Sequence, residues 1–333
     1  MKKESKRKTS IKSSILILLL IAILLISSTY AWFTANTNVE ISTLDVKVEG
    51  KNGLQISADG TTWKTVLENT DIAPATLAGD SGKYKNNKNQ IPTIMEPVST
   101  IGELNTDGTM KMFFGTVKSA INGAQQLTAS PLTDAQGTEG KYIAFDVFLK
   151  VDEKTQLSLT QDSTVTVKKD QASKGLENSS RVAFCVLGNT GAGSDITTIQ
   201  GLNAASGTTQ RKSHIWEPNY DTHTAAAIAH ARDNYGLTVT DGGEKVEYYG
   251  VKAEITEDNA VALDSKDTYF EKVTPEYATK KENQDDTVML ELEAGITKVR
   301  IYMWVEGQDI DCENTASGSD IAFSVKFSIP AKK

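Results

Sequence analysis

The chain has 333 residues, of which 39% are hydrophobic and 23% charged, and its formal net charge is −8. This length allows one large β domain or two ordinary domains, and the composition is that of a folded protein. Without its first 31 residues, which hold six bases and one acid, the chain carries a formal charge of −13. A surface this acidic repels nucleic acid and anionic lipid, so we exclude both as partners.

The first 31 residues have the layout of a secretory signal. Six Lys and Arg residues and one acid lie in residues 2–12, and an unbroken aliphatic run occupies residues 15–26. Thr29 and Ala31 then provide small residues ahead of Trp32. This order predicts that signal peptidase cleaves after Ala31, that the basic head stays cytoplasmic and that the rest of the chain is secreted.

Retention of the hydrophobic segment is the alternative. Residues 15–33 would form a helix rising ~1.5 Å per residue, which nearly spans a ~30 Å hydrocarbon core. Tyr30, Trp32 and Phe33 would then lie at the outer interface. The product would be a single-pass protein, anchored only through residues 15–33, with its C-terminus outside. We favour cleavage because the polar residues 27–29 are typical of a cleavage region.

Two strand patterns follow this junction. Residues 39–48 alternate but change phase, which predicts a bulge at residues 42–43. The apolar residues 53–57 and 62–66 then flank Asp59-Gly60. An Asp-Gly pair in this position predicts a hairpin, because the turn requires positive φ.

Residues 67–140 contain many Gly, Asn and Asp residues and little periodicity, apart from a strand pattern at residues 110–117. We interpret them as a loop-rich insertion. A second such insertion is predicted at residues 188–285, with a strand at residues 247–251 and one helix at residues 225–231.

The predicted helix has recognisable ends. Thr222 or Thr224 caps its N-terminus, and Gly236 ends it.

The remaining chain consists of alternating apolar segments, which predict strands. They lie at residues 142–151, 157–159, 164–167, 181–187, 287–292, 296–305 and 321–329. Short alternating strands with one or two short helices predict an all-β fold, an antiparallel β-sandwich formed by residues 32–333.

Two segments resemble known exported proteins. Ser28-Thr-Tyr-Ala-Trp-Phe-Thr34, followed by an alternating strand, resembles the junction of Gram-positive exported proteins with a SipW-type signal peptide, which include the matrix-fibre protein TasA and the camelysins. Residues 304–314 are similar to a signature of uncharacterised exported Firmicute proteins. The resemblance implies a role at the cell surface or in the extracellular matrix of a biofilm.

Cys185 and Cys312 are the two cysteines. In an exported chain they could form one disulfide, worth about 4–5 kcal/mol in the chain-entropy model. Alternatively they are two buried thiols that act as small apolar residues.

Three histidines, His214, His223 and His230, lie close to Glu217 and Asp221. Imidazole and carboxylate groups are suitable zinc ligands. The spacing matches no metal motif, however, so we interpret them as ordinary loop and helix histidines.

Asp309, Asp311, Glu313 and Asp320 occupy positions 1, 3, 5 and 12 of a potential calcium loop. Asn314 stands where the calcium loop needs glycine, and the surrounding pattern is strand rather than helix. The alternative is an acidic connection between strands. We therefore predict no metal and no other cofactor.

The chain has no catalytic motif: no nucleophile elbow, His-Glu-x-x-His pair, phosphate loop or Cys-x-x-Cys. Glu291 and Glu293 alternate on a strand, as acids on a solvated face do. We therefore expect a non-enzymatic protein.

Two functions fit these observations. The first is a surface or matrix structural protein that self-assembles when its N-terminal strand joins a neighbouring sheet. The second is an adhesin or ligand-binding ectodomain whose long loops form the contacts.

Overall fold

The computed structural model describes residues 41–72, 87–119, 125–203, 213–235, 237–243, 246–257, 266–275, 287–313 and 317–331. The predicted signal segment and its junction at Thr29, Ala31 and Trp32 lie outside these ranges. Within them, no helix combines the length and the hydropathy needed to cross a membrane.

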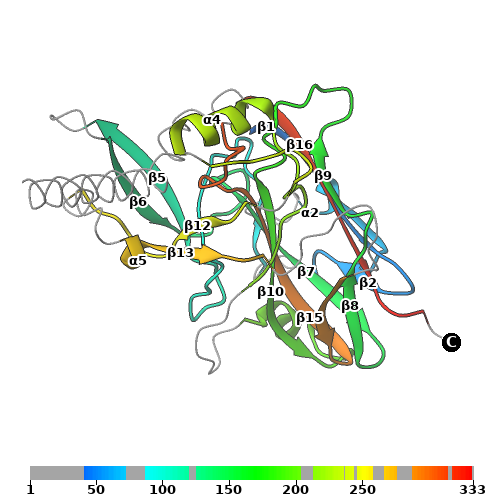
Figure 1. Cartoon of the computed structure of the whole chain (residues 1–333). Helices are drawn as coiled ribbons and strands as arrows, with labels where there is room; N and C mark the ends of the chain where they lie inside the picture. Colours follow the sequence, from blue (N-terminus) through cyan, green and yellow to red (C-terminus); the bar gives the residue numbers. More distant parts are fainter. Residues whose placement is uncertain are drawn as a thin grey trace, which may run out of the picture.

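Two six-stranded sheets form the body of the molecule (Figure 1). The first sheet has the order β14 (Thr287–Leu292), β8 (Thr155–Leu159), β16 (Ser319–Ser328), β1 (Ile41–Gly50) and β3 (Val66–Glu68), and β9 (Thr164–Val167) also pairs with β16. The second has the order β11 (His214–Trp216), β10 (Ser180–Thr190), β15 (Gly295–Val305), β7 (Ile143–Val151) and β2 (Gln55–Ser57), and β4 (Asn89–Gln90) also pairs with β7. The prediction of a mainly β fold is confirmed.

The hydrophobic core lies between the two sheets. On β16, Ile321, Phe323, Val325 and Phe327 are at most 1% exposed, while the three side chains between them are partly exposed. The rings of Phe327 and Phe184, which come from different sheets, pack edge to face with centroids 5.5 Å apart. The alternation in sequence therefore corresponds to one core-facing side of the strand.

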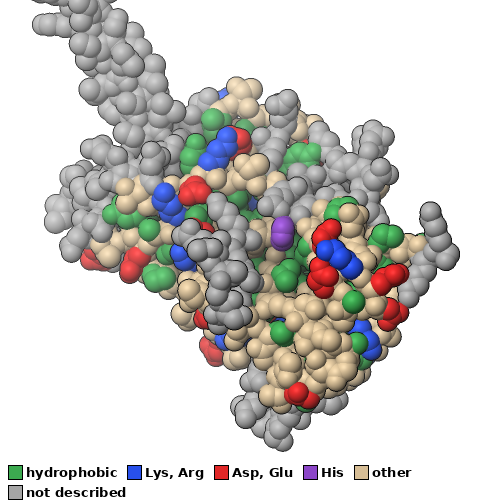
Figure 2. All heavy atoms as spheres, turned by 90° about the horizontal axis from the view of Figure 1, so that it is seen from below, with side chains coloured by type: hydrophobic (Ala, Val, Ile, Leu, Met, Phe, Trp, Pro, Cys, Tyr) green, Lys and Arg blue, Asp and Glu red, His purple; other side chains and the backbone are tan. Residues whose placement is uncertain are grey.

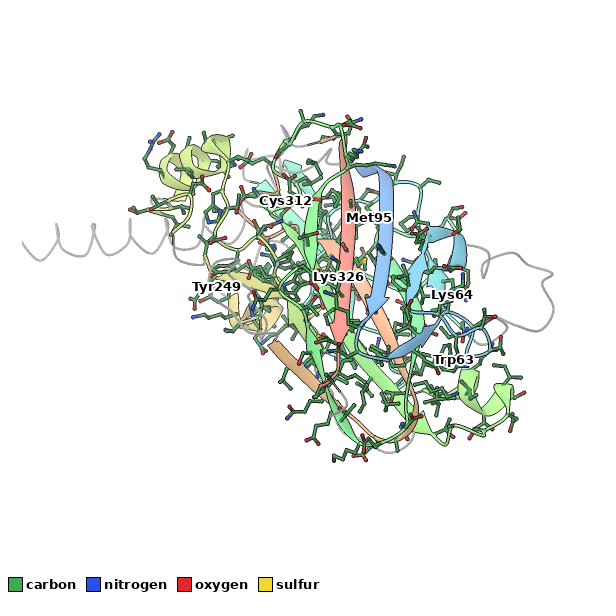
Figure 3. All side chains as sticks on the ribbon, turned by 90° about the vertical axis from the view of Figure 1, so that its right-hand side faces the viewer. Trp63, Lys64, Met95, Tyr249, Cys312 and Lys326 are labelled. Atoms are coloured by element: carbon green, nitrogen blue, oxygen red, sulfur yellow. The ribbon has the colours of Figure 1, made fainter. Side chains whose placement is uncertain are left out.

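Strand β1 departs from the predicted antiparallel arrangement. It runs parallel to β16, with Leu44 opposite Ile321 and Gly50 opposite Phe327 (Figure 3). Its register shifts between Ile41 and Leu44, as the change of phase predicted. A parallel pair needs no hairpin, because a long crossover connects its strands. Here most of the chain forms that crossover, so no local sequence pattern marks the pairing.

The second sheet is buried on both faces. Every residue of β15 is buried, and the core-side residues of β7 alternate with Ala144, Asp146 and Phe148, which are also 0% exposed. A third layer covers the outer face. It contains the hairpin of β5 (Met112–Ser119) with β6 (Gln125–Leu132) and the pair of β12 (Tyr248–Val251) with β13 (Phe270–Val273) (Figure 1). The segments predicted as loop-rich insertions thus supply a packed layer.

Four short helices are described: α2 (Asn69–Ile72), α3 (Ile196–Gly201), α4 (Ala225–Tyr235) and α5 (Lys266–Tyr269). The predicted helix corresponds to α4, and Thr224 is its cap, since the Thr224 hydroxyl accepts a hydrogen bond from the Ala227 N–H at 3.1 Å. Gly236 lies outside the described residues.

The predicted Asp-Gly turn is present between β2 and Lys64. Ile56 and Lys64 exchange two backbone hydrogen bonds of 2.8 Å, and Gly60 has φ +74°. The second arm of this hairpin pairs with β2 at one position, Lys64 opposite Ile56. The following strand, β3, pairs with β1 and not with β2. Trp63 and Lys64 lie at one side of the molecule, far from Tyr249 (Figure 3).

Buried charges lie on the outer face of the second sheet. Asp146 accepts hydrogen bonds from Arg300 Nε at 2.7 Å and Arg300 Nη2 at 3.1 Å, and its Oδ2 lies 3.2 Å from Lys298 Nζ. Burial alone would raise the pKa of Asp146, but the two cations outweigh burial and lower it. The polar side of β7 therefore faces an internal ion-pair network, not solvent.

Candidate functional site

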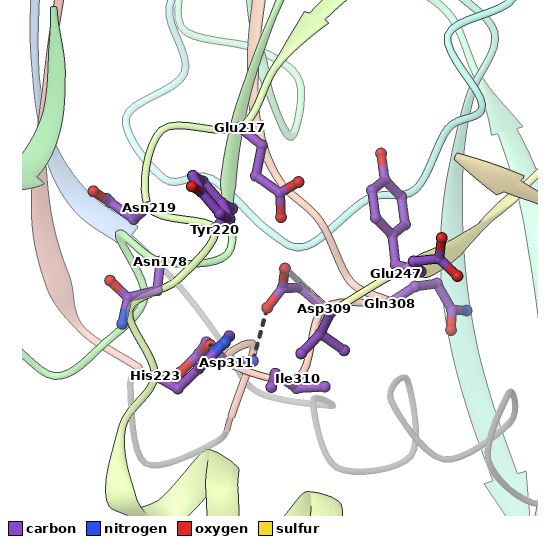
Figure 4. A pocket seen from close by; sticks show the side chains of 12 residues that line it. Asn178, Glu217, Asn219, Tyr220, His223, Glu247, Gln308, Asp309, Ile310 and Asp311 are labelled. Atoms are coloured by element: carbon purple, nitrogen blue, oxygen red, sulfur yellow. Dashed lines mark hydrogen bonds and ion pairs between the residues drawn. The ribbon is translucent and has the colours of Figure 1, made fainter. Parts of the chain in front are cut away.

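The concentration of buried charge at one end of the second sheet marks the candidate site (Figure 4). Its central element is the segment of residues 306–313, which directly follows β15 and which we call the acidic loop. The loop is shaped by local turns: Asp309 N–H donates to the Glu306 carbonyl, and Asp311 N–H donates to Asp309 Oδ1 at 2.8 Å. The loop has four acids, Glu306, Asp309, Asp311 and Glu313, and each contacts a different part of the chain.

Arg181, at the start of β10, binds two carboxylates, of which one belongs to the acidic loop. Its Nη2 donates to Glu217 Oε1 at 2.6 Å and also to Asp309 Oδ2, and the side chain is 0% exposed. Burial alone would lower the pKa of Arg181, but the carboxylates of Glu217 and Asp309 outweigh burial and raise it. The guanidinium therefore joins β10, the segment after β11 and the acidic loop.

Asp311 binds the segment that leads into α4. Its Oδ2 lies 2.7 Å from Nδ1 of His223, and its Oδ1 accepts a hydrogen bond from the Thr224 N–H at 2.9 Å. Burial lowers the pKa of His223, but the contact with Asp311 outweighs this and the pKa is raised. A carboxylate at this position also favours the N-terminal end of α4 electrostatically.

Glu313 binds α4 itself, through Nδ1 of His230. Burial raises the pKa of the Glu313 carboxyl, and the proximity of His230 opposes this effect. The two histidines thus connect α4 and the residues before it to adjacent acids of one loop.

Glu306 is the fourth acid and is 0% exposed. Its carboxyl accepts hydrogen bonds from Trp304 Nε1 at 3.0 Å and the Gln308 N–H at 3.1 Å, and Ser99 also donates to it. Burial raises its pKa to about 7, because these contacts and the charge of Arg181 only partly compensate for lost hydration.

A small pocket opens beside these ion pairs (Figure 4). Asn178, Glu217, Tyr248 and Gln308 are among the lining residues, and the cavity volume of about 10 Å³ corresponds to one water-sized sphere. The hydroxyl of Tyr248 and both amide atoms of Gln308 are buried without a hydrogen-bond partner in the protein. Such atoms favour an ordered water in the pocket.

The residues of the predicted calcium loop do not converge on one point. Asp309 binds Arg181, Asp311 binds His223 and Glu313 binds His230. Asp320 lies apart on β16, where its carbonyl accepts the Lys168 N–H. No group of three or more metal-ligating side chains is found within the described ranges.

The histidines considered as zinc ligands also separate. His214 lies on β11 opposite Phe184, while His223 and His230 contact acids of the loop. The structure thus brings two of the three histidines, His223 and His230, into contact with Asp311 and Glu313.

Cys185 and Cys312 are free thiols and are each 1% exposed. Cys185 packs under the third layer, and Cys312 packs in the core between the sheets. The structure therefore has the second of the two predicted alternatives, and the disulfide is not formed.

Three residues of the site were not predicted from the sequence: Arg181, Glu306 and Tyr248. One signal was available for Arg181, because it begins a strongly hydrophobic strand where a charge needs a partner. Glu306 and Tyr248 have no comparable pattern.

The chain matches no protein-family model, no curated protein sequence and no solved structure.

Proposed function

We propose that this chain is an exported, non-enzymatic structural protein of the cell surface or extracellular matrix, assembled when β1 of one copy joins the first sheet of another. The position of β1 is the observation that supports this most directly. It is an interior strand of the first sheet, between β16 and β3, and it is the first described strand after the predicted cleavage junction.

The pairing of β1 is suited to exchange between copies. Its partner β16 belongs to the other end of the chain, and the two strands are paired from Leu44 to Gly50 without a connecting hairpin. Backbone pairing of this kind is the same whether the strand comes from the same copy or from another. Asn52 and Gly53, with φ of 59° and 89°, form the turn that follows β1 and would be the hinge.

The charged groups are consistent with a structural role. The acids of the acidic loop are bound by Arg181, His223, His230 and neutral donors, and the pocket beside them is far smaller than the ~300 Å³ of a small-molecule site. On the face seen in Figure 2, Asp and Glu side chains lie beside Lys and Arg side chains among hydrophobic ones. Such mixed charge keeps an exported protein soluble.

A disulfide trap tests the exchange of β1. Lys47 and Ser324 are directly opposite each other on β1 and β16, and both are partly exposed. Neighbouring strands are about 5 Å apart, a separation that a disulfide can bridge. The exported chain with Lys47→Cys and Ser324→Cys is oxidised and run on a non-reducing gel.

The two origins of β1 give different products. Exchange between copies gives a ladder of covalent multimers that reduction collapses, and electron microscopy shows filaments. A purely monomeric cross-linked product would contradict the proposal. Each single variant is the control, because it can form at most dimers.

A ligand-binding ectodomain is the second candidate. The base of the β5–β6 hairpin packs in the third layer, and its other end extends away from the sandwich (Figure 1), where it could contact a partner. A glycan array with the exported chain tests this function, and hits that disappear when the hairpin is replaced by a short turn would support it.

N-terminal sequencing of protein recovered from cells distinguishes a secreted chain beginning at Trp32 from a membrane-anchored one.

A further inference from the structure

The turn that follows β1 has a chemically labile sequence. Residues 51–54 form a tight β-turn, closed by a hydrogen bond of 3.2 Å from the Leu54 N–H to the Lys51 carbonyl. Its central residues, Asn52 and Gly53, have φ of 59° and 89°, and both are exposed. A turn with positive φ at both central positions favours Asn-Gly, so the turn itself explains why this pair is present. The same pair, however, leaves the asparagine side chain open to attack by the backbone.

Glycine after asparagine provides a backbone nucleophile. The nitrogen of Gly53, once it has lost its proton, can attack Cγ of the Asn52 side chain and close a succinimide ring. Gly53 has no side chain to hinder this attack, and glycine reaches unusual backbone angles at little cost. Among the described residues, no acceptor is found for the Gly53 N–H. The turn therefore leaves both reacting groups accessible to solvent.

The Asn52 side chain also anchors the C-terminal end of β16. Its Nδ2 donates a hydrogen bond of 2.7 Å to the carbonyl of Ile329, the residue after β16. Ile329 is 8% exposed and belongs to the core between the sheets. The Lys51 N–H donates to the Phe327 carbonyl at 2.9 Å, so the turn holds this end of the chain at two points. Loss of the amide from residue 52 removes one of them.

We propose that Asn52 is a site of spontaneous deamidation, and that the reaction releases Ile329 and loosens the C-terminal end of β16. The bond from the Gly53 nitrogen to Asn52 Cγ forms while the bond from Cγ to Nδ2 breaks, and ammonia leaves. Water then opens the succinimide at either of its carbonyl carbons. The products are aspartate and isoaspartate at position 52, and water is the only co-reactant.

Both products lose the contact with Ile329. Aspartate has no N–H to donate, and its carboxylate lies next to the Ile329 carbonyl, where the two oxygens repel each other. Isoaspartate adds one carbon to the backbone, so the turn no longer has the geometry that closes it. In both cases the Ile329 carbonyl lacks its partner, and hydration of such a group favours separation from the turn.

Asn105 provides a reference within the same chain. It is also exposed, and its Nδ2 donates a hydrogen bond of 2.9 Å to the Thr109 hydroxyl. The residue after it is Thr106, whose branched side chain hinders attack by the backbone nitrogen. Asn52 and Asn105 thus differ mainly in the residue that supplies the nucleophile.

Incubation of the folded exported chain in water labelled with heavy oxygen tests the reaction. Peptide mass spectrometry after digestion at mildly acidic pH then locates each deamidation by its gain in mass. We expect Asn52 to react at least about tenfold faster than Asn105, a factor that a modest difference in activation free energy provides. The rate should rise with pH, because the nucleophile is the deprotonated amide. An Asn52 that reacts only after unfolding in urea would overturn the proposal, since the turn would then protect it.

Hydrogen exchange measures the release of the chain end. After the reaction, we expect exchange in residues 327–329 to be faster by roughly fivefold, the factor expected for one lost hydrogen bond. Strand β15 is the internal reference and keeps its protection. Exchange in residues 327–329 that is unchanged in the deamidated chain would show that the contact with Ile329 does not hold this end.

Three variants separate the contact from the reaction. Asn52→Asp has one of the products from the start, so we expect fast exchange in residues 327–329 without incubation. Asn52→Gly accepts the positive φ and cannot react, so its exchange should be faster than that of the original chain and should not change with time. Asn105→Asp is the control, and its exchange in residues 327–329 should match that of the original chain. Equal exchange in Asn52→Asp and Asn105→Asp would contradict the role of Asn52.

Discussion

Arg181 and Asp309 form a buried ion pair although they are 128 residues apart in the sequence. The same nitrogen of Arg181 also donates to Glu217. One guanidinium therefore joins the start of β10, the segment after β11 and the acidic loop. Because the arginine is fully buried, its two partners depend on it for charge compensation.

We expect Arg181→Met to destabilise the protein by about 3–5 kcal/mol, because it leaves Glu217 and Asp309 buried without a counter-ion. Urea unfolding at neutral pH measures this loss. Arg232→Met is the control, since Arg232 is exposed, and its effect should stay within about 0.5 kcal/mol. Adding Glu217→Gln and Asp309→Asn to Arg181→Met should recover part of the loss. An equal effect of Arg181→Met and Arg232→Met would contradict this account.

Asp146 has the opposite role on the outer face of the second sheet, since it compensates two buried cations, Arg300 and Lys298. We expect Asp146→Asn to cost about 3–5 kcal/mol at neutral pH. The pKa of Asp146 is lowered by these cations, so the stability it contributes is present above its unfolded pKa and lost as pH falls through the folded value. The difference between variant and original chain should therefore shrink in acid.

Urea unfolding at about pH 7 and pH 3 checks this dependence. Asp233→Asn, at an exposed pair with Arg232, is the control and should change stability little at either pH. A cost of Asp146→Asn that is the same at both pH values would show that Asp146 acts through packing instead.

Close backbone contact joins the third layer to the rest of the chain at Gly250. A Cβ atom at this position would lie 2.2 Å from the carbonyl oxygen of Thr100, so the strand β12 or the segment at residues 99–101 must move. We expect Gly250→Ala to cost about 1–3 kcal/mol, as overpacking does. Gly193→Ala is the matched control, because a Cβ there meets nothing within 4 Å. Thermal unfolding of the two variants checks the difference.

Local patterns predicted the strands well where neighbours in sequence determine the structure. Strands β9 and β14 lie at the predicted residues 164–167 and 287–292, and Thr224 caps α4 as one of the two predicted alternatives. Alternation identified the core side of β7 correctly. These features depend on periods of two or on a single turn, which short windows of sequence contain.

Pairing over long distances was not predictable in this way. The parallel match of β1 with β16 joins opposite ends of the described chain, and nothing near Leu44 indicates it. The contacts of the acidic loop were not predictable either. The spacing of Asp309, Asp311 and Glu313 fits a calcium loop and fits ion pairs equally well. Their partners come from β10, from the segment before α4 and from α4 itself, so only the fold determines which side chain binds each acid.

The two thiols should be inert in the folded protein. Burial raises the pKa of both Cys185 and Cys312, and both are 1% exposed. We expect no reaction with an alkylating reagent under native conditions, and two alkylated thiols per chain after denaturation without a reductant. Intact mass measures both numbers. A denatured chain that gains no label until it is reduced would show that a disulfide forms.

Glu306 should make stability depend on pH. Its pKa of about 7 exceeds the ordinary value of 4.5. A raised carboxyl pKa contributes stability that is complete below the unfolded value and is lost as pH rises to the folded value. The loss therefore occurs between about pH 4.5 and pH 7, and a shift of this size corresponds to about 3 kcal/mol.

Glu306→Gln removes this loss, because the amide is neutral at every pH. The variant should resemble the original chain at about pH 5 and exceed its stability by about 1–3 kcal/mol at pH 8, since Gln retains one acceptor for Trp304 or for the Gln308 N–H. Urea unfolding across this range measures the difference. Glu68→Gln, at an exposed position of β3, is the control and should not change the profile. If Glu306→Gln follows the original chain at every pH, then Glu306 is already ionised in the folded protein, and the charge of Arg181 compensates it fully.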